Sequence, residues 1–213
     1  IIGCGKIAQV RHLPEYEQNP GARIAGLYDL NQERAQALAA QYGAKAYGSY
    51  EALLADPAID AVSVCTWNSA HAPCTIMALE AGKDVLCEKP MALNAQEAQQ
   101  MLDTARKCGR KLMIGFVRRF GNDTEIMQDF LNAGTLGDIY LAKATYLRRN
   151  GNPGGWFGDK SRSGGGPLID LGVHVIDLTR YLMGNPKPVS VYGATFRKIG
   201  NRSGLKEMVQ YVS

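Results

Sequence analysis

The chain lacks any long hydrophobic run. Its apolar stretches, such as residues 61–65, are far shorter than the roughly 20 residues that cross a bilayer. A charged-then-apolar leader with a small-residue cleavage site is also absent, so we expect neither export nor a membrane partner. The formal charge is only +4, and the basic clusters have no interleaved aromatics, which argues against a nucleic-acid partner.

Cysteine is scarce, and its spacing predicts no cross-link. The five cysteines are an odd number and include no C-x-x-C pair. Cys65 and Cys87 fall inside apolar runs, where a free thiol packs as a small hydrophobe. This usage favours a reducing, cytoplasmic setting and implies no zinc or other metal site.

Segments typical of strands and helices alternate along the first half of the chain. Strands are expected at residues 1–2, 22–28, 61–65, 84–87 and 111–116. Helices are expected from about residue 6 and over residues 31–42, 50–55, 73–81 and 95–108. Alternating β and α units predict an α/β fold, a doubly wound parallel sheet with right-handed crossovers.

The pattern changes after about residue 120. A helix over 125–133 precedes an alternating segment, 139–147, which is typical of an antiparallel strand with one exposed face. A glycine-rich loop then leads to a helix over 168–183 and a strand over 189–195. We expect a domain boundary within 117–122. The chain opens and closes in what read as interrupted strands, so we expect a partial chain, with residues missing near 200–204.

The first glycine turn has the spacing G-x-G-x-x-A, between a strand and a helix. Gly3 permits the tight turn, Gly5 lets a pyrophosphate approach the backbone, and a small Ala8 lets the helix pack on the strand. The pyrophosphate would sit on the free N–H groups of the helix start, at Lys6 and Ile7. The turn therefore predicts a dinucleotide site, with a purely structural glycine turn as the alternative.

Asp29 follows the second expected strand, 21 residues beyond Ala8. A carboxylate there accepts a hydrogen bond from the ribose 2′-hydroxyl and repels a 2′-phosphate. This favours NAD as the cofactor. Arg34 lies close enough to keep NADP possible, and a helix-capping role for Asp29 is the alternative.

Two further clusters carry groups suited to chemistry. Glu88-Lys89-Pro90 follows an expected strand, at the sheet edge where ligands of open α/β sheets collect. Asp170, His174 and Asp177 are spaced to share one helical face behind the glycine-rich loop. Alone, such a lysine is most often a surface residue and such a histidine a core residue, so their combination is what indicates a site.

Taken in order, these motifs resemble one family. The glycine turn, Asn68-Ser69-Ala70-His71, Glu88-Lys89-Pro90 and G-G-G-x-x-x-D-x-G-x-H-x-x-D resemble the Gfo/Idh/MocA oxidoreductases (glucose–fructose oxidoreductase and inositol dehydrogenase). The resemblance implies an NAD(P)-binding Rossmann domain over 1–119. It also implies an α+β domain over 120–213, incomplete here, whose mainly antiparallel open sheet often joins homodimers or homotetramers.

The resemblance also assigns roles by position. It implies a catalytic set of Lys89, Asp170 and His174. The residues along the cofactor would be Thr66, Asn68, His71 and Glu88, and those at the substrate would be Arg119 and Asp177. Trp156, in the glycine-rich loop, is a further candidate for the substrate pocket. Trp67 departs from the proline of many relatives and puts the shape of the cofactor cleft in doubt.

The resulting hypothesis is oxidation of a secondary alcohol on a sugar, polyol or inositol. His174 would accept the hydroxyl proton while a hydride passes to the nicotinamide, and Lys89 would stabilise developing negative charge on the oxygen. Asp170 would orient the hydroxyl or the imidazole. The alternatives are an NAD-assisted glycosidase of the same family and a non-catalytic Rossmann-fold ligand sensor.

Overall fold

A parallel sheet forms the centre of the first half of the chain. The computed structural model describes residues 1–147 and 153–196. The strands are β1 (Gly26–Leu27), β2 (Lys45–Ala46), β3 (Ala61–Val64), β4 (Asp84–Cys87) and β5 (Leu112–Ile114). Each pairs in parallel with its neighbour, β1 with β2, β3 with β4 and β4 with β5.

Ile2 joins the two parts of this sheet. It forms parallel bridges to Tyr28, at the end of β1, and to Val64 in β3. The spatial order is therefore β2-β1-Ile2-β3-β4-β5, the strand order of a dinucleotide-binding doubly wound sheet. The expected α/β, Rossmann-type fold is confirmed.

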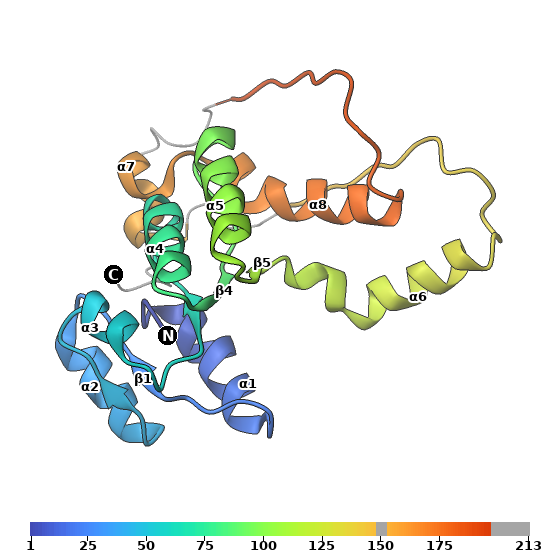
Figure 1. Ribbon diagram of the computed structural model, residues 1–213. Helices are drawn as coiled ribbons and strands as arrows, with labels where there is room; N and C mark the ends of the chain where they lie inside the picture. The colour runs from blue at the N-terminus through green and yellow to red at the C-terminus, as the bar shows by residue number, and fades with distance from the viewer. Residues whose placement is uncertain (148–152, 197–213) are drawn as a thin grey trace.

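Helices cross between successive strands, as the alternation predicts (Figure 1). They are the π-helical turn η1 (Ala8–His12), α1 (Leu13–Gln18), α2 (Gln32–Gln41), α3 (Tyr50–Ala55), α4 (Asn68–Glu80) and α5 (Ala95–Cys108). Side chains of Asn31, Ser49 and Asn94 cap three of them by accepting backbone N–H groups. At the other end of α5, Gly109 takes the left-handed conformation that stops the helix.

Helix α4 begins five residues earlier than the sequence predicts, at Asn68 instead of Pro73. A proline inside a helix removes one backbone hydrogen bond and normally marks a boundary. Here Asn68, His71 and Ala72 are all buried in the first turns. Their packing against the neighbouring elements outweighs the missing bond.

The main core lies where the sheet meets α4 and α5, which pack side by side. Ile2, Val64, Leu79 and Met101 are all at most 1% exposed there. The apolar run at residues 61–65 is buried along nearly all its length, as expected for a strand covered on both faces. This core holds the carboxyl ends of the strands in fixed positions.

The regular elements in the second half of the described chain are all helices or helical turns, joined by long loops. Its elements are the 3-10 turn η2 (Val117–Phe120), α6 (Asn122–Asn132), the 3-10 turn η3 (Gly155–Gly158), α7 (Lys160–Ser163), the π-helical turn η4 (Leu168–Gly172) and α8 (Val173–Leu182). Helix α7 packs on α4, while α6 and α8 contact each other away from the sheet (Figure 1). The domain boundary within 117–122 stays a prediction.

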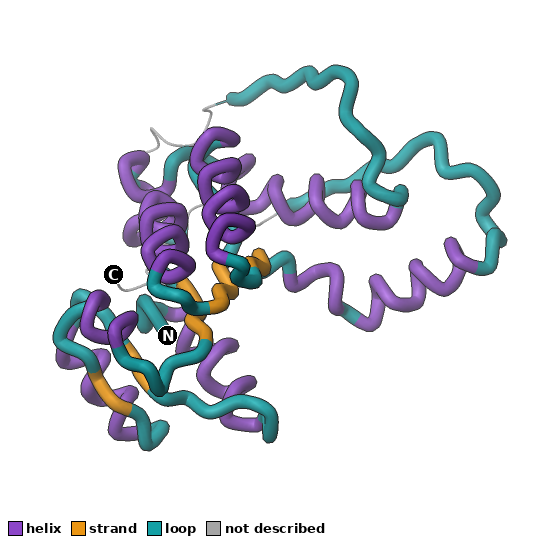
Figure 2. Tube along the Cα trace, viewed as in Figure 1, coloured by secondary structure: helices purple, strands orange, loops and turns teal. Residues whose placement is uncertain are grey.

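The antiparallel strands expected at 139–147 and 189–195 are not formed in the described part of the chain. Both segments are long loops in Figure 2. Their side chains are exposed, for example 92% for Tyr140 and 95% for Tyr192. An alternating sequence becomes a strand only when a neighbour satisfies its N–H and C=O groups, and no described segment pairs with either one. The break expected near 200–204 lies outside the described residues.

None of the helices in the described ranges combines the length and apolarity needed to span a bilayer.

Replacing Ile2 by alanine should cost about 2–5 kcal/mol of unfolding free energy, because the side chain is 1% exposed between the two parts of the sheet. Urea denaturation checks this. Val10→Ala, at a position 53% exposed on η1, is the matched control and should change stability by less than about 0.5 kcal/mol. Equal losses in the two variants would contradict the central position of Ile2.

Candidate active site

A cavity of about 750 Å³ lies between the glycine turn, the carboxyl end of β4 and the segment from η4 to α8. All three histidines of the chain, His12, His71 and His174, line it. Both π-helical turns in the described residues contribute to it, η1 through His12 and η4 through Asp170. Such turns are frequent at functional sites. A second cavity, of about 610 Å³, lies at the opposite, amino ends of the strands.

The glycine turn has the geometry that a pyrophosphate requires. Gly3 has φ +88°, and a Cβ there would lie 2.7 Å from the Cys65 carbonyl oxygen. A Cβ at Gly5 would meet no atom within 4 Å, and Gly5 lines the cavity together with Lys6 and Ile7. Ala8, the first residue of η1, is fully buried. Close packing at the first position and open space at the second fit a dinucleotide phosphate group.

Asp29 is buried, with 5% of its surface exposed, and its carboxylate contacts the backbone of the glycine turn. Its carboxylate accepts hydrogen bonds from the N–H groups of Cys4 (2.6 Å) and Asn31 (2.7 Å). It also pairs with the Arg34 guanidinium at 2.8 Å. Asn31, rather than Asp29, caps α2. Asp29 is not among the residues lining the cavity, so its contact with a ribose stays a prediction.

Lys89 and Asp170 meet inside the cavity although they are 81 residues apart. The Lys89 ammonium donates to Asp170 Oδ1 at 2.9 Å and to the Asp170 carbonyl oxygen at 3.0 Å. The two side chains are 18% and 15% exposed. The ion pair therefore attaches the end of β4 to the turn that begins the last helix.

His174 lies one turn beyond Asp170 and also lines the cavity. Burial lowers its pKa to about 4, and the positive charges of Lys89 and Arg118 contribute, while Asp170 and Glu88 act in the opposite direction. Its Nδ1 is buried and has no hydrogen-bond partner among the described residues. At neutral pH the ring is uncharged, which suits it to accept a proton.

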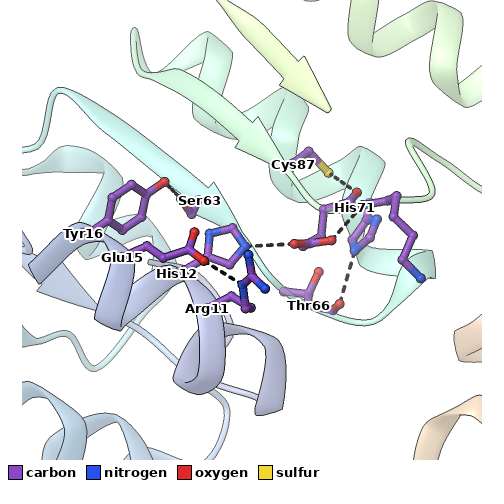
Figure 3. Close-up of polar contacts among 10 residues, drawn as sticks. Arg11, His12, Glu15, Tyr16, Ser63, Thr66, His71 and Cys87 are labelled. Carbon is purple, nitrogen blue, oxygen red and sulfur yellow. Dashed lines mark hydrogen bonds and ion pairs between the residues drawn. The ribbon is translucent and has the colours of Figure 1, made fainter. Parts of the chain in front are cut away.

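Glu88 and His71 hold the backbone around Lys89. The Glu88 carboxylate contacts His12 Nε2 at 2.9 Å and accepts the Lys89 N–H at 3.1 Å. His71 contacts the carbonyl oxygen of Thr66 at 3.2 Å (Figure 3). Its other ring nitrogen contacts the carbonyl oxygen of Pro90 at 2.6 Å. Burial lowers the pKa of His71, although these two backbone contacts raise it. His71 thus connects the loop after β3 with the loop after β4.

The other expected cofactor residues lie at the same edge of the sheet. Asn68 lines the cavity, and its amide donates to the Ser163 carbonyl oxygen at 2.8 Å, which ties α4 to α7. Thr66 lines it as well. Trp67 stands where the resemblance leads us to expect proline. The Arg162 guanidinium lies over its ring, 4.8 Å from the ring centre. Cofactor contacts at these positions stay predictions.

Trp156 lines the cavity with Phe157, against which its ring stacks at 3.9 Å between centroids. A flat aromatic surface of this kind suits the apolar face of a ring-shaped substrate. The expectation for Trp156 therefore agrees with its position, and its contact with a substrate stays a prediction.

Arg119 and Asp177, the residues expected at the substrate, contact each other in the structure, and a substrate contact for either one stays a prediction. They form a two-pronged ion pair with each other, with Arg119 Nε 2.8 Å from Asp177 Oδ2, and neither is among the cavity-lining residues. Arg119 also lies over the Tyr181 ring. The pair fastens η2 to α8. The adjacent Arg118 lines the cavity instead, because the tight turn of η2 points neighbouring side chains in different directions.

His12 and Arg118 are among the cavity residues that sequence reasoning missed, and both can carry charge. The signal for His12 was its place four residues after Ala8 on the helix that begins at the glycine turn. The signal for Arg118 was weaker, since two adjacent arginines are equivalent until the backbone is known. Among the described residues, no group of three or more potential metal ligands gathers.

These features define a dinucleotide-binding Rossmann domain whose phosphate turn and ionisable groups share one cavity. Comparison with known proteins agrees. Residues 1–116 match the family model described as "Oxidoreductase family, NAD-binding Rossmann fold", and residues 125–211 match the GFO/IDH/MocA C-terminal domain. The chain belongs to the GFO/IDH/MocA oxidoreductase family, and the expected class of cofactor, NAD(P), is confirmed.

Named relatives include a D-glucoside 3-dehydrogenase of Escherichia coli, 42% identical over 99% of this chain and 61% of that protein. A myo-inositol 2-dehydrogenase of Thermotoga maritima is 30% identical over 86% of this chain and 54% of its own length. A solved 3-ketoreductase from Actinomadura kijaniata in complex with NADP is 29% identical, with a TM-score of 0.73, over 85% of this chain and 56% of that one. The chain thus spans little more than half the length of these proteins.

The two glycines should respond differently to a side chain. Gly5→Val should leave the melting temperature nearly unchanged but raise the Kd for NAD(P) at least about tenfold, because the new side chain fills the phosphate space. Gly3→Ala should lower the melting temperature, since its φ of +88° and the Cys65 carbonyl oxygen leave no room. Calorimetric titration and thermal unfolding measure both. Unchanged NAD(P) binding in Gly5→Val would contradict the assignment.

Burial lowers the pKa of His174 to about 4, and the positive charges of Lys89 and Arg118 lower it as well, so Arg118→Gln should raise this pKa by removing one of the charges. An NMR titration of the histidine ring protons measures this, and only three histidines need assignment. Arg118→Lys retains the charge and should titrate close to the wild type. Identical His174 curves for the glutamine variant and the wild type would show that Arg118 does not act on this ring.

Proposed function

We propose that the chain carries the cofactor-binding and catalytic residues of an NAD(P)-dependent dehydrogenase. Its substrate would be a secondary alcohol on a sugar, polyol or inositol. One observation carries the proposal, namely that Lys89, Asp170 and His174 meet in the cavity that the glycine turn also lines. A cofactor with its pyrophosphate on that turn can bring its other end to these three residues.

His174 is the proton acceptor in this proposal. Its imidazole is neutral at physiological pH, and its buried Nδ1, which has no partner among the described residues, can take the substrate hydroxyl proton. General base catalysis of this kind typically contributes about 10²–10⁴ in rate. In the reverse direction, the protonated ring returns the proton to the oxygen.

Lys89 stabilises the negative charge that develops on the reacting oxygen. Its ammonium has three N–H donors, and two of them are used by the carboxylate and carbonyl oxygens of Asp170. Asp170 thereby aims Lys89 into the cavity, which is the orienting role we assign to it. When bound, NAD(P) supplies the hydride acceptor for alcohol oxidation.

The proposed substrate class follows from the relatives and from the cavity. The named relatives act, by their names, on a D-glucoside and on myo-inositol, both of which carry ring hydroxyls. The stacked Trp156 and Phe157 offer an aromatic surface for such a ring. The choice of NAD over NADP, assembly into homodimers or homotetramers, and a cytoplasmic location stay predictions.

His174→Ala in the full-length protein should lower turnover by about 10²–10⁴ and leave the Kd for NAD(P) nearly unchanged. The assay follows NAD(P)H absorbance with D-glucosides, free sugars and inositols, using NAD and NADP in parallel. Glu17→Gln, on an exposed position of α1 outside the cavity, is the control and should match the wild type. Wild-type turnover in His174→Ala would remove the proposed base. Sugar release from an aryl glycoside without net NAD(P)H formation would favour a glycosidase.

A further inference from the structure

A buried imidazole–carboxylate pair lies beside the proposed catalytic residues. His12 Nε2 and Glu88 Oε1 are 2.9 Å apart, and their side chains are 9% and 11% exposed. They come from the first helix and from the end of β4, 76 residues apart in the chain. A carboxylate buried to this degree requires hydrogen-bonding partners, because removing an ion from water is otherwise very costly.

The backbone of η1 directs His12 to this position. The π-helical turn Ala8–His12 follows directly on the glycine turn, and His12 is its last residue. The ring contacts the edge of Tyr16 at 6.0 Å between centroids. Tyr16 is itself anchored by a 2.7 Å hydrogen bond between its hydroxyl and Ser63 Oγ (Figure 3). The imidazole is thus held from its own helix and from β3.

The pair continues into the catalytic residues through hydrogen bonds. The second Glu88 oxygen accepts the backbone N–H of Lys89 at 3.1 Å. The Lys89 ammonium in turn donates to Asp170 at 2.9 Å. Contacts therefore run without a gap from His12 through Glu88 and Lys89 to Asp170.

We propose that His12 is a positioning residue of the reaction, which holds the Glu88 carboxylate so that Glu88 fixes the backbone of Lys89 and aims its ammonium at Asp170. The proposal rests on the proposed function, in which Lys89 acts on the reacting oxygen. It also gives the first helix a second role. The helix that receives the phosphate at its start orients the lysine through His12, the last residue of η1.

The electrostatics of Glu88 agree with this role. Burial by itself would raise the pKa of Glu88, but the hydrogen bond and charge of His12, with the N–H and charge of Lys89, lower it overall. Glu88 is therefore a carboxylate at neutral pH and accepts from both partners. Without the imidazole, the same buried charge would have to reorganise around Lys89, and the lysine would move with it.

Four variants of the full-length protein test the proposal. His12→Leu keeps apolar bulk and removes the ring nitrogen, whereas His12→Gln keeps an amide donor that can reach Glu88. Glu88→Met removes the carboxylate, and the fourth variant combines His12→Leu with Glu88→Met. We expect His12→Leu to lower kcat about 10- to 100-fold through misplaced Lys89, with the Kd for NAD(P) changed less than about threefold. His12→Gln should recover most of kcat.

The double variant separates positioning from simple packing. If His12 acts through Glu88, the double variant should be about as slow as Glu88→Met alone. Losses that multiply in the double variant would overturn the proposal. So would a raised Kd for NAD(P) with unchanged kcat, which would make His12 a cofactor contact instead.

A measurement that does not require enzymatic turnover tests the positioning role independently of the proposed function. Hydrogen exchange of the Lys89 amide, which donates to Glu88, should be about tenfold faster or more in His12→Leu and Glu88→Met, and unchanged in the Glu17→Gln control. Unchanged exchange in His12→Leu would overturn the proposal. If His12→Leu fails to fold, the hydrogen exchange of the Lys89 amide in His12→Gln and Glu88→Met tests the proposal instead. Absence of any dehydrogenase activity in the wild type would instead refute the proposed function and leave the exchange result standing.

Discussion

The ion pair between Lys89 and Asp170 is the interaction on which the site depends. It joins the end of a strand in the parallel sheet to the π-helical turn that opens the last helix, and both side chains are largely shielded from water. A solvent-exposed ion pair would contribute little to stability. In this pair, other contacts also fix the positions of the two residues. Glu88 fixes the backbone of the lysine, and the η4 turn presents both the carboxylate and the carbonyl oxygen of Asp170. The position of His174 in the cavity follows from the same attachment.

The three histidines of the cavity show how surroundings give one side chain different tasks. His71 has both ring nitrogens against backbone carbonyl oxygens, so it binds two loops together. His12 faces a carboxylate and holds it in place. His174 has a buried nitrogen without a partner in the described part of the chain, and burial together with nearby positive charge lowers its pKa to about 4. Only that third environment leaves a ring free to exchange a proton with a bound molecule.

Much of the first half was predictable from local pattern. The bounds of α3, β4 and α5 match the expected segments, because capping residues, apolar runs and the stop at Gly109 are local signals. The glycine turn behaves as its spacing predicts, with Gly3 in close contact and Gly5 open. Helix α4 was predicted too short, since burial of its first turn outweighs Pro73. The strands expected at 139–147 and 189–195 are not formed. Alternation predicts that a segment can pair, but it does not supply the neighbouring strand with which to pair.

The sequence by itself determined the α/β class, from the alternation of strand and helix patterns, and the phosphate turn, from its glycine spacing. Lys89, Asp170 and His174 became candidates through their local positions together with the family resemblance. Tertiary structure alone decided which groups meet. It paired Arg119 with Asp177 outside the cavity and turned Arg118 into it. It also brought His12 to Glu88 across 76 residues. Helical periodicity defines the faces of a helix, but packing between distant segments decides what each face contacts.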